Sequence, residues 1–144
     1  MKRRAGLILF AVILLVGFGA AQAGAQTTQS FTIQSFSANY YLDRSATGTS
    51  LLKTVEIIQA EFPSYDQNHG ILRAIPESYQ GHTVSLKIDS VTDENNAPLN
   101  YTTLGQNGNL VVKIGTTGAY VHGLKTYKIT YNQRNVISFQ SDHD

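Results

Sequence analysis

The chain contains no cysteine and no tryptophan, and only 15% of its 144 residues are charged. Without cysteine it can form no disulfide bond, no thiolate metal site and no thiol nucleophile. It also has no Gly-x-Ser-x-Gly nucleophile elbow, and no glycine-rich stretch that continues into Gly-Lys-Ser/Thr. The sequence therefore lacks the signatures of thiol, serine-elbow and phosphate-loop chemistry.

The N-terminus has the pattern of an export signal. Met1–Arg4 is basic, and Ala5–Ala21 is an apolar run without a charge. Small residues at Ala21, Ala23 and Ala25 fit the small-x-small cleavage rule, so residues 1–25 are predicted to be a secretory signal peptide. An uncleaved membrane anchor is the alternative, although the run is shorter than the ~20 residues that a span needs.

Cleavage would leave 119 residues: a polar leader at 26–30 and one domain at 31–144. The loss of Lys2, Arg3 and Arg4 changes the formal charge from +1 to −2, and no basic cluster remains. We therefore expect no nucleic-acid partner. An exported domain without disulfides favours a bacterial or archaeal envelope.

Alternating apolar residues and regular turn signals predict an all-β fold. The expected strands are Phe31–Ile33 with Phe36–Leu42, Leu51–Phe62, Val84–Ile88, Leu99–Leu104, Leu110–Ile114 and Lys125–Tyr131. A phase slip between Phe31–Ile33 and Phe36–Leu42 predicts a β-bulge or a bend, and one within Leu51–Phe62 predicts a bulge. Helix is the competing prediction for Leu51–Phe62. Gln106–Asn109 predicts an Asn-Gly hairpin. We expect an antiparallel β-sandwich of immunoglobulin-like type, with a small closed barrel as the alternative.

Asn68–Pro76 is the most unusual stretch. His69 and Gly70 belong to a turn, and Pro76 prevents a helix from passing through. Arg73 is embedded in apolar residues, so its guanidinium must reach water or a carboxylate. The nearest carboxylates in sequence are Glu56, Glu61 and Asp66. We favour a structural Arg73 that locks this crossover to a strand; a ligand-facing arginine is the alternative.

Candidate contact or structural residues gather around this stretch. They are His69, Gly70, Arg73, Pro76, Tyr65 and Tyr79, the two tyrosines being expected on flanking loops. By contrast, Tyr40, Tyr127 and Tyr131 are expected in the core or at its boundary.

Several segments together resemble a known family. They are the signal, Phe31–Leu42, Val55–Phe62, Gly70–Pro76, Lys113–Gly115, Thr126–Tyr131 and Phe139–Asp144. The chain resembles the N-terminal extracytoplasmic domain of predicted prokaryotic membrane proteins, grouped as domain of unknown function 2207. The resemblance implies further strands and transmembrane helices beyond Asp144, hence a truncated, membrane-anchored protein; a complete chain would be secreted. It brings no activity, cofactor or catalytic residue.

Sites of catalysis are not evident. The four histidines are widely separated, no metal-ligand spacing occurs, and no cofactor is expected. We expect a non-enzymatic binding or spacer module whose partner is an envelope protein or polymer. The alternative is an envelope hydrolase, in which acidic residues or histidines converge only in the fold.

Overall fold

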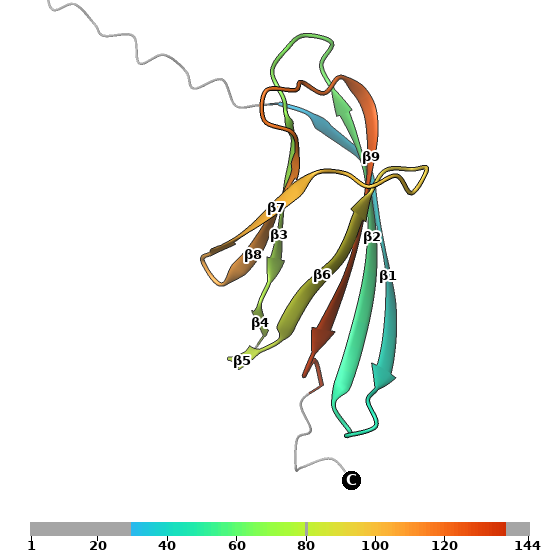
Figure 1. The fold of residues 1–144 in the computed structure, drawn as a ribbon, viewed down its shortest axis with the longest axis vertical. Coiled ribbons are helices and arrows are strands. Elements are labelled where there is room, and N and C mark those ends of the chain that lie inside the picture. The colour runs from blue at the N-terminus through green and yellow to red at the C-terminus, as the bar shows by residue number, and fades with distance from the viewer. Residues whose placement is uncertain (1–29, 80, 138–144) are drawn as a thin grey trace, which may run out of the picture.

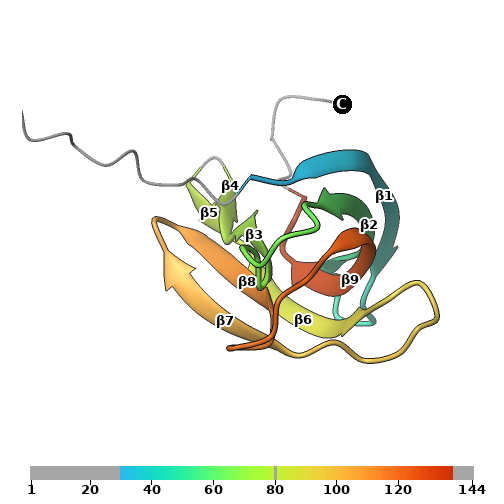
Figure 2. The ribbon, with the colours of Figure 1, turned by 90° about the horizontal axis from the view of Figure 1, so that it is seen from above.

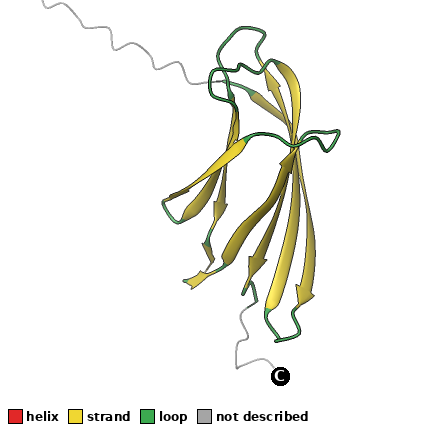
Figure 3. Cartoon of the chain, viewed as in Figure 1, coloured by secondary structure: helices red, strands yellow, loops and turns green. Residues whose placement is uncertain are grey.

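A computed structural model describes residues 30–79 and 81–137 of the chain. The predicted signal peptide and the closing segment from Phe139 lie outside the described residues. The described residues form strands and loops without a helix (Figure 3), and none of them forms an apolar helix long enough to cross a membrane. The strands are β1 (Thr32–Arg44), β2 (Ser50–Phe62), β3 (Gly70–Pro76), β4 (Ser78–Tyr79), β5 (His82–Thr83), β6 (Ser85–Thr92), β7 (Tyr101–Gln106), β8 (Asn109–Gly115) and β9 (Gly123–Arg134).

The strands form two packed antiparallel sheets, so the predicted β-sandwich is confirmed. The larger sheet has the order β1-β2-β9-β6 and the smaller one has the order β3-β8-β7, with β4-β5 as a separate hairpin (Figure 1). Figure 2 shows the small sheet lying along one side of the larger one. Four strands facing three is the division found in immunoglobulin constant-type domains. Here β9, the last strand, lies between β2 and β6.

The core lies between the sheets and follows the period-two alternation of the strands. In β9, Tyr127, Ile129 and Tyr131 point inward and are buried. The other members of the core are Ile58, Ala60, Phe62, Ile71, Ile75, Val91, Val112 and Ile114. The tyrosine prediction holds for Tyr127 and Tyr131, but it is wrong for Tyr40, which is 64% exposed because β1 has no facing strand.

The first predicted bulge is confirmed: the β1–β2 register shifts between Ile33 and Ser35. The bulge expected in Leu51–Phe62 is wrong, since β2 pairs with β9 without a shift from Leu51 to Phe62. Apolar residues lie on both faces of β2 in this unbroken register: Ile58, Ala60 and Phe62 are buried on the inner face, while Val55 and Ile57 are half-buried on the outer face. The Asn-Gly hairpin is confirmed between β7 and β8, where Asn107 and Gly108 both have positive φ.

The two sides of the sandwich differ. Along β6 and β7 the sheets are joined, because Thr92 bridges to Pro98 and the amide of Leu99 donates to the carbonyl of Val91 at 2.9 Å. On the opposite side β1 and β3 are the edge strands of their sheets. Of these two strands, β3 faces β2 and leaves most of β1 uncovered.

Candidate functional site

Arg73 of β3 points between the sheets and meets Glu56 of β2. Its Nε and Nη2 donate to Glu56 Oε2 and Oε1, each at 2.7 Å, in the bidentate geometry of a strong ion pair. The Glu56 side chain is 2% exposed, whereas that of Arg73 is 32% exposed. Tyr131 of β9 donates its hydroxyl to Glu56 Oε1 at 3.0 Å. The carboxylate is therefore satisfied from both sheets and links them.

The electrostatics of this cluster follow from burial and from the ion pair. The hydrogen bond to Glu56 raises the pKa of Arg73 above its ordinary value, so the guanidinium stays charged. Burial, and then the charge of Glu56, raise the pKa of the Tyr131 phenol. Phe36 of β1 lies with its ring 5.6 Å from the guanidinium carbon. These contacts occupy Arg73 within the fold and leave it little freedom to bind a ligand.

Gly70 begins β3 at a point where the backbone comes very close to β8. It pairs with Gly115, and both residues have φ in the left-handed half of conformational space, at 135° and 141°. A Cβ atom on Gly70 would lie 1.9 Å from the carbonyl oxygen of Ile114. Glycine is therefore required at this crossing for a structural reason.

The loop that precedes Gly70 is held against the β8–β9 loop. The backbone amide of Val121 donates to the carbonyl of Asn68 at 2.8 Å. His69 lies with Nδ1 2.8 Å from the carbonyl of Ala119, and its ring stacks on Tyr120 with centroids 4.4 Å apart. The contact with Ala119 and the stacking on Tyr120 therefore fix the position of the His69 ring.

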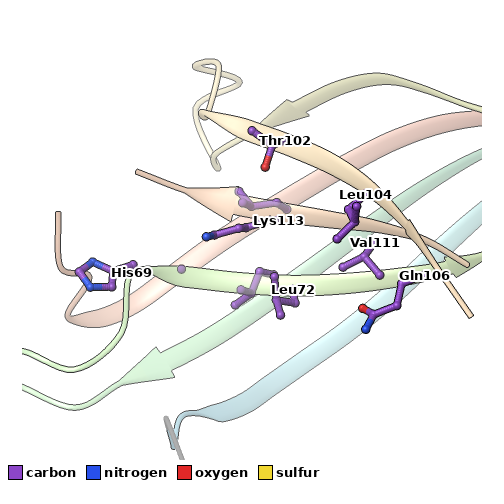
Figure 4. A pocket seen from close by; sticks show the side chains of 10 residues that line it. His69, Leu72, Thr102, Leu104, Gln106, Val111 and Lys113 are labelled. Atoms are coloured by element: carbon purple, nitrogen blue, oxygen red, sulfur yellow. The ribbon is translucent and has the colours of Figure 1, made fainter. Parts of the chain in front are cut away.

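A hollow of about 430 Å³ lies on the outer face of the small sheet, beside His69 (Figure 4). Leu72 of β3, Val111 of β8 and Leu104 of β7 are adjacent outward positions, because Leu104 pairs with Val111 and Leu72 with Lys113. Leu72 and Leu104, on the two strands that flank β8, are 68% and 65% exposed. The side chains thus form an apolar surface in the middle of the sheet.

Polar side chains surround this apolar surface. They belong to His69, Thr102, Gln106 and Lys113. Among the described residues that line the hollow, none is acidic, and Lys113 is the one with a permanent positive charge. The hollow can therefore accept an apolar group and, beside Leu72 at Lys113, an anionic one.

The six predicted contact residues do not form one site. His69 and Gly70 border the hollow, whereas Arg73 lies between the sheets and Pro76 ends β3. Tyr65 is exposed on the β2–β3 loop. Tyr79 is exposed as well, but it belongs to β4 rather than to a loop, and it borders a second hollow with His82.

The sequence interpretation missed Leu72, Leu104 and Lys113. Alternation within Gly70–Pro76 and Leu110–Ile114 predicts which residues share a face with Leu72 and with Lys113. It does not predict that β3, β8 and β7 are neighbours, which is what assembles the hollow.

One histidine does meet a carboxylate. His122 Nε2 lies 3.0 Å from Asp66 Oδ1, between the β8–β9 and β2–β3 loops. Both side chains are well exposed, and neither lines the hollow on the small sheet. Within residues 30–79 and 81–137, no group of three or more His, Asp or Glu side chains could hold a metal ion.

Comparison of the chain with protein-family models, with curated proteins and with solved structures finds no match. The resemblance to the prokaryotic membrane-protein family accordingly stays a prediction.

Proposed function

We propose that the chain is an extracytoplasmic binding module without catalysis, whose partner is a segment of another envelope protein that carries an apolar side chain beside a carboxylate. The observation that carries this proposal is the composition of the hollow on the small sheet. Leu72, Leu104 and Val111 provide its apolar surface, and Lys113 provides a cation without an acidic neighbour among the lining residues. The export pattern of residues 1–25 supports an extracytoplasmic location.

The chemistry of the partner follows from the hollow. Two exposed leucines lose contact with water when an apolar side chain covers them, which stabilises a complex by about 25 cal/mol per Å² of apolar surface. Lys113 adds a charge contact at an exposed position, where water screens it, so its main effect is on selectivity. A module that only spaces other parts apart would need neither feature.

A displayed library of random short peptides tests this proposal. Peptides selected on the folded chain should be enriched in a large apolar residue next to Asp or Glu. Lys113→Glu should lower the affinity of these acidic peptides several-fold, and Leu104→Asp should abolish their binding, while circular dichroism stays unchanged. Lys87→Glu is the matched control, because Lys87 is an exposed lysine on β6 of the other sheet. An equal loss of peptide affinity in Lys113→Glu and Lys87→Glu would contradict the proposed binding site. Selected peptides without an acidic residue would contradict it as well.

The hydrolase alternative has one observation in its favour, the contact between His122 and Asp66. A carboxylate beside an imidazole can orient it as a general base. It predicts hydrolysis of an activated ester such as p-nitrophenyl acetate that is lost in His122→Ala and in Asp66→Asn. Under the binding proposal, the chain and both variants hydrolyse this ester at the same background rate.

A further inference from the structure

β1 is a long edge strand without the usual protection against pairing. It extends over 13 residues, and among the described strands none pairs with its outer edge. Thr32–Leu42 contains no charged residue and no proline. Edge strands of stable monomers normally carry charges, prolines or bulges that prevent another strand from adding to them. β1 has a bulge near its start, but its register is regular from Ser35 to Arg44.

The other edge strands of the sandwich are either protected in this way or short. On β6, Lys87 and Asp89 are charged, and the register shifts between Ile88 and Ser90. β3 ends at Pro76 after seven residues. β7 has neither charge nor proline, but with six residues it is less than half as long as β1. Among these four strands, β1 therefore presents the longest edge without protection.

The inward face of β1 is also apolar and uncovered. Phe36, Tyr40 and Leu42 lie opposite positions of β2 that point into the sandwich, yet they are 52%, 64% and 61% exposed. Ile33 adds exposed apolar surface to this face, and Tyr41 adds it to the outward face, where it pairs with Lys53. An apolar face along an open backbone edge is a surface to which another strand can add.

We propose that this edge pairs with β1 of a second copy of the chain, antiparallel and about a two-fold axis at Ala38. In such a pair, residues equally far before and after Ala38 lie opposite each other and on the same face. Phe36 of each copy then meets Tyr40 of the other copy, and Ser37 meets Asn39. Aromatic cross-strand pairs are among the most favourable on a sheet.

The sequence of β1 is self-complementary in this register. The two Phe36–Tyr40 pairs and the small Ala38 share the inward face. On the outward face, Ser37 meets Asn39, and Tyr41 meets Ser35 further from the axis. No like charges meet, because Asp43 and Arg44 lie beyond the paired centre. The two larger sheets become one continuous sheet, and each copy covers part of the exposed inward face of the other.

The available surface suits a modest dimer. An aromatic side chain covers about 150–250 Å², so Phe36, Tyr40 and Tyr41, each about half exposed, offer roughly 300 Å² per copy. The aliphatic side chains and the edge backbone of two copies bring the total towards the ~1,200 Å² at which specific interfaces begin. We therefore expect a reversible dimer that dissociates on dilution.

Sedimentation of the exported chain over a wide concentration range tests the proposal. A monomer–dimer equilibrium is expected. Ala38→Lys should raise the dimer dissociation constant several-fold or more, because the axis places the two introduced lysines opposite each other. Ser85→Lys is the matched control, since it adds the same charge to an exposed position at the other edge of the same sheet, and it should leave the dimer unchanged.

Introduced thiols test the register, because the chain has no cysteine of its own. In Ala38→Cys the two thiols meet at the axis, so mild oxidation should give a disulfide-linked dimer. In Ser37→Cys the thiols are offset and should cross-link far less. Cross-linking that is strongest at Asn39→Cys would overturn the register. A monomer at every concentration, or a dimer that Ala38→Lys does not weaken, would overturn the proposal.

Discussion

β1 and β2 are equally long and pair with each other, but they have opposite environments. Each has 13 residues, and in β2 the inward positions from Thr54 to Phe62 are all buried. In β1 every residue except the half-buried Ala38 is exposed. Phe36 and Ile58 are direct neighbours across the ladder, yet Phe36 is 52% exposed and Ile58 is 4% exposed. Alternation of apolar residues therefore shows that a segment is a strand, but not that its apolar face is covered.

The difference arises from the width of the two sheets. Three strands face four, and the ion pair between Arg73 and Glu56 fixes β3 over β2. This places β1 beyond the edge of the small sheet. The same asymmetry makes β2 the strand on which stability depends and β1 the strand that is open to a partner.

Removal of Arg73 should cause the largest loss of stability, because it removes the ion pair that joins β3 to β2. Arg73→Ala leaves the buried carboxylate of Glu56 without its cation, although the hydroxyl of Tyr131 still donates to it. Because Arg73 is partly exposed, the loss of unfolding free energy should be at most about 3–5 kcal/mol. Urea unfolding followed by circular dichroism measures this loss. Lys53→Ala, at an exposed position on β2, is the control and should change little. The double variant Glu56→Leu with Arg73→Met should recover much of the loss, since no buried charge remains.

A stable Arg73→Ala variant that loses its peptide affinity would give the opposite result. It would make Arg73 a ligand-binding residue and its contact with Glu56 incidental.

Matched truncations on the two strands should give unequal losses. Ile58→Ala removes a buried side chain and should cost about 2–4 kcal/mol. Phe36→Ala removes a larger but exposed side chain and should cost less than about 1 kcal/mol, mainly through its contact with Arg73. Urea unfolding of both variants measures the two losses of unfolding free energy. Equal losses would mean that something covers β1 in solution, and a concentration dependence would identify it as a second copy.

Alkaline pH should lower the unfolding free energy, because the buried tyrosines of the core ionise more readily in the unfolded chain. Burial raises the pKa of the Tyr127 phenol to about 12, whereas tyrosine in an unfolded chain ionises near pH ~10. A raised folded pKa means that the contribution is complete below pH ~10 and is lost as the pH rises towards 12. Tyr127→Phe should flatten this decline in unfolding free energy. Tyr41→Phe on β1 is the control, and an equal effect from it would contradict the argument.

Local pattern predicted most of the strands, and tertiary contact decided the rest. The bulge at Ile33–Ser35 and the Asn107–Gly108 turn depend on neighbouring residues alone, so they were predictable. Which carboxylate would meet Arg73 was open among three until β3 was placed over β2. The hollow was missed for the same reason, because Leu72 and Leu104 come from strands that are not adjacent in sequence.

By itself, the sequence determined that the described part of this chain is made of strands without disulfides, and where most of its turns lie. These properties follow from side-chain alternation, glycine conformation and the absence of cysteine, which act over a few residues. Only the tertiary structure decided that Tyr131 is covered and Tyr40 is not, and that Arg73 faces inward while Leu72 faces outward over the hollow. Burial depends on which strands face each other across the sandwich, and that pairing involves residues far apart in the chain.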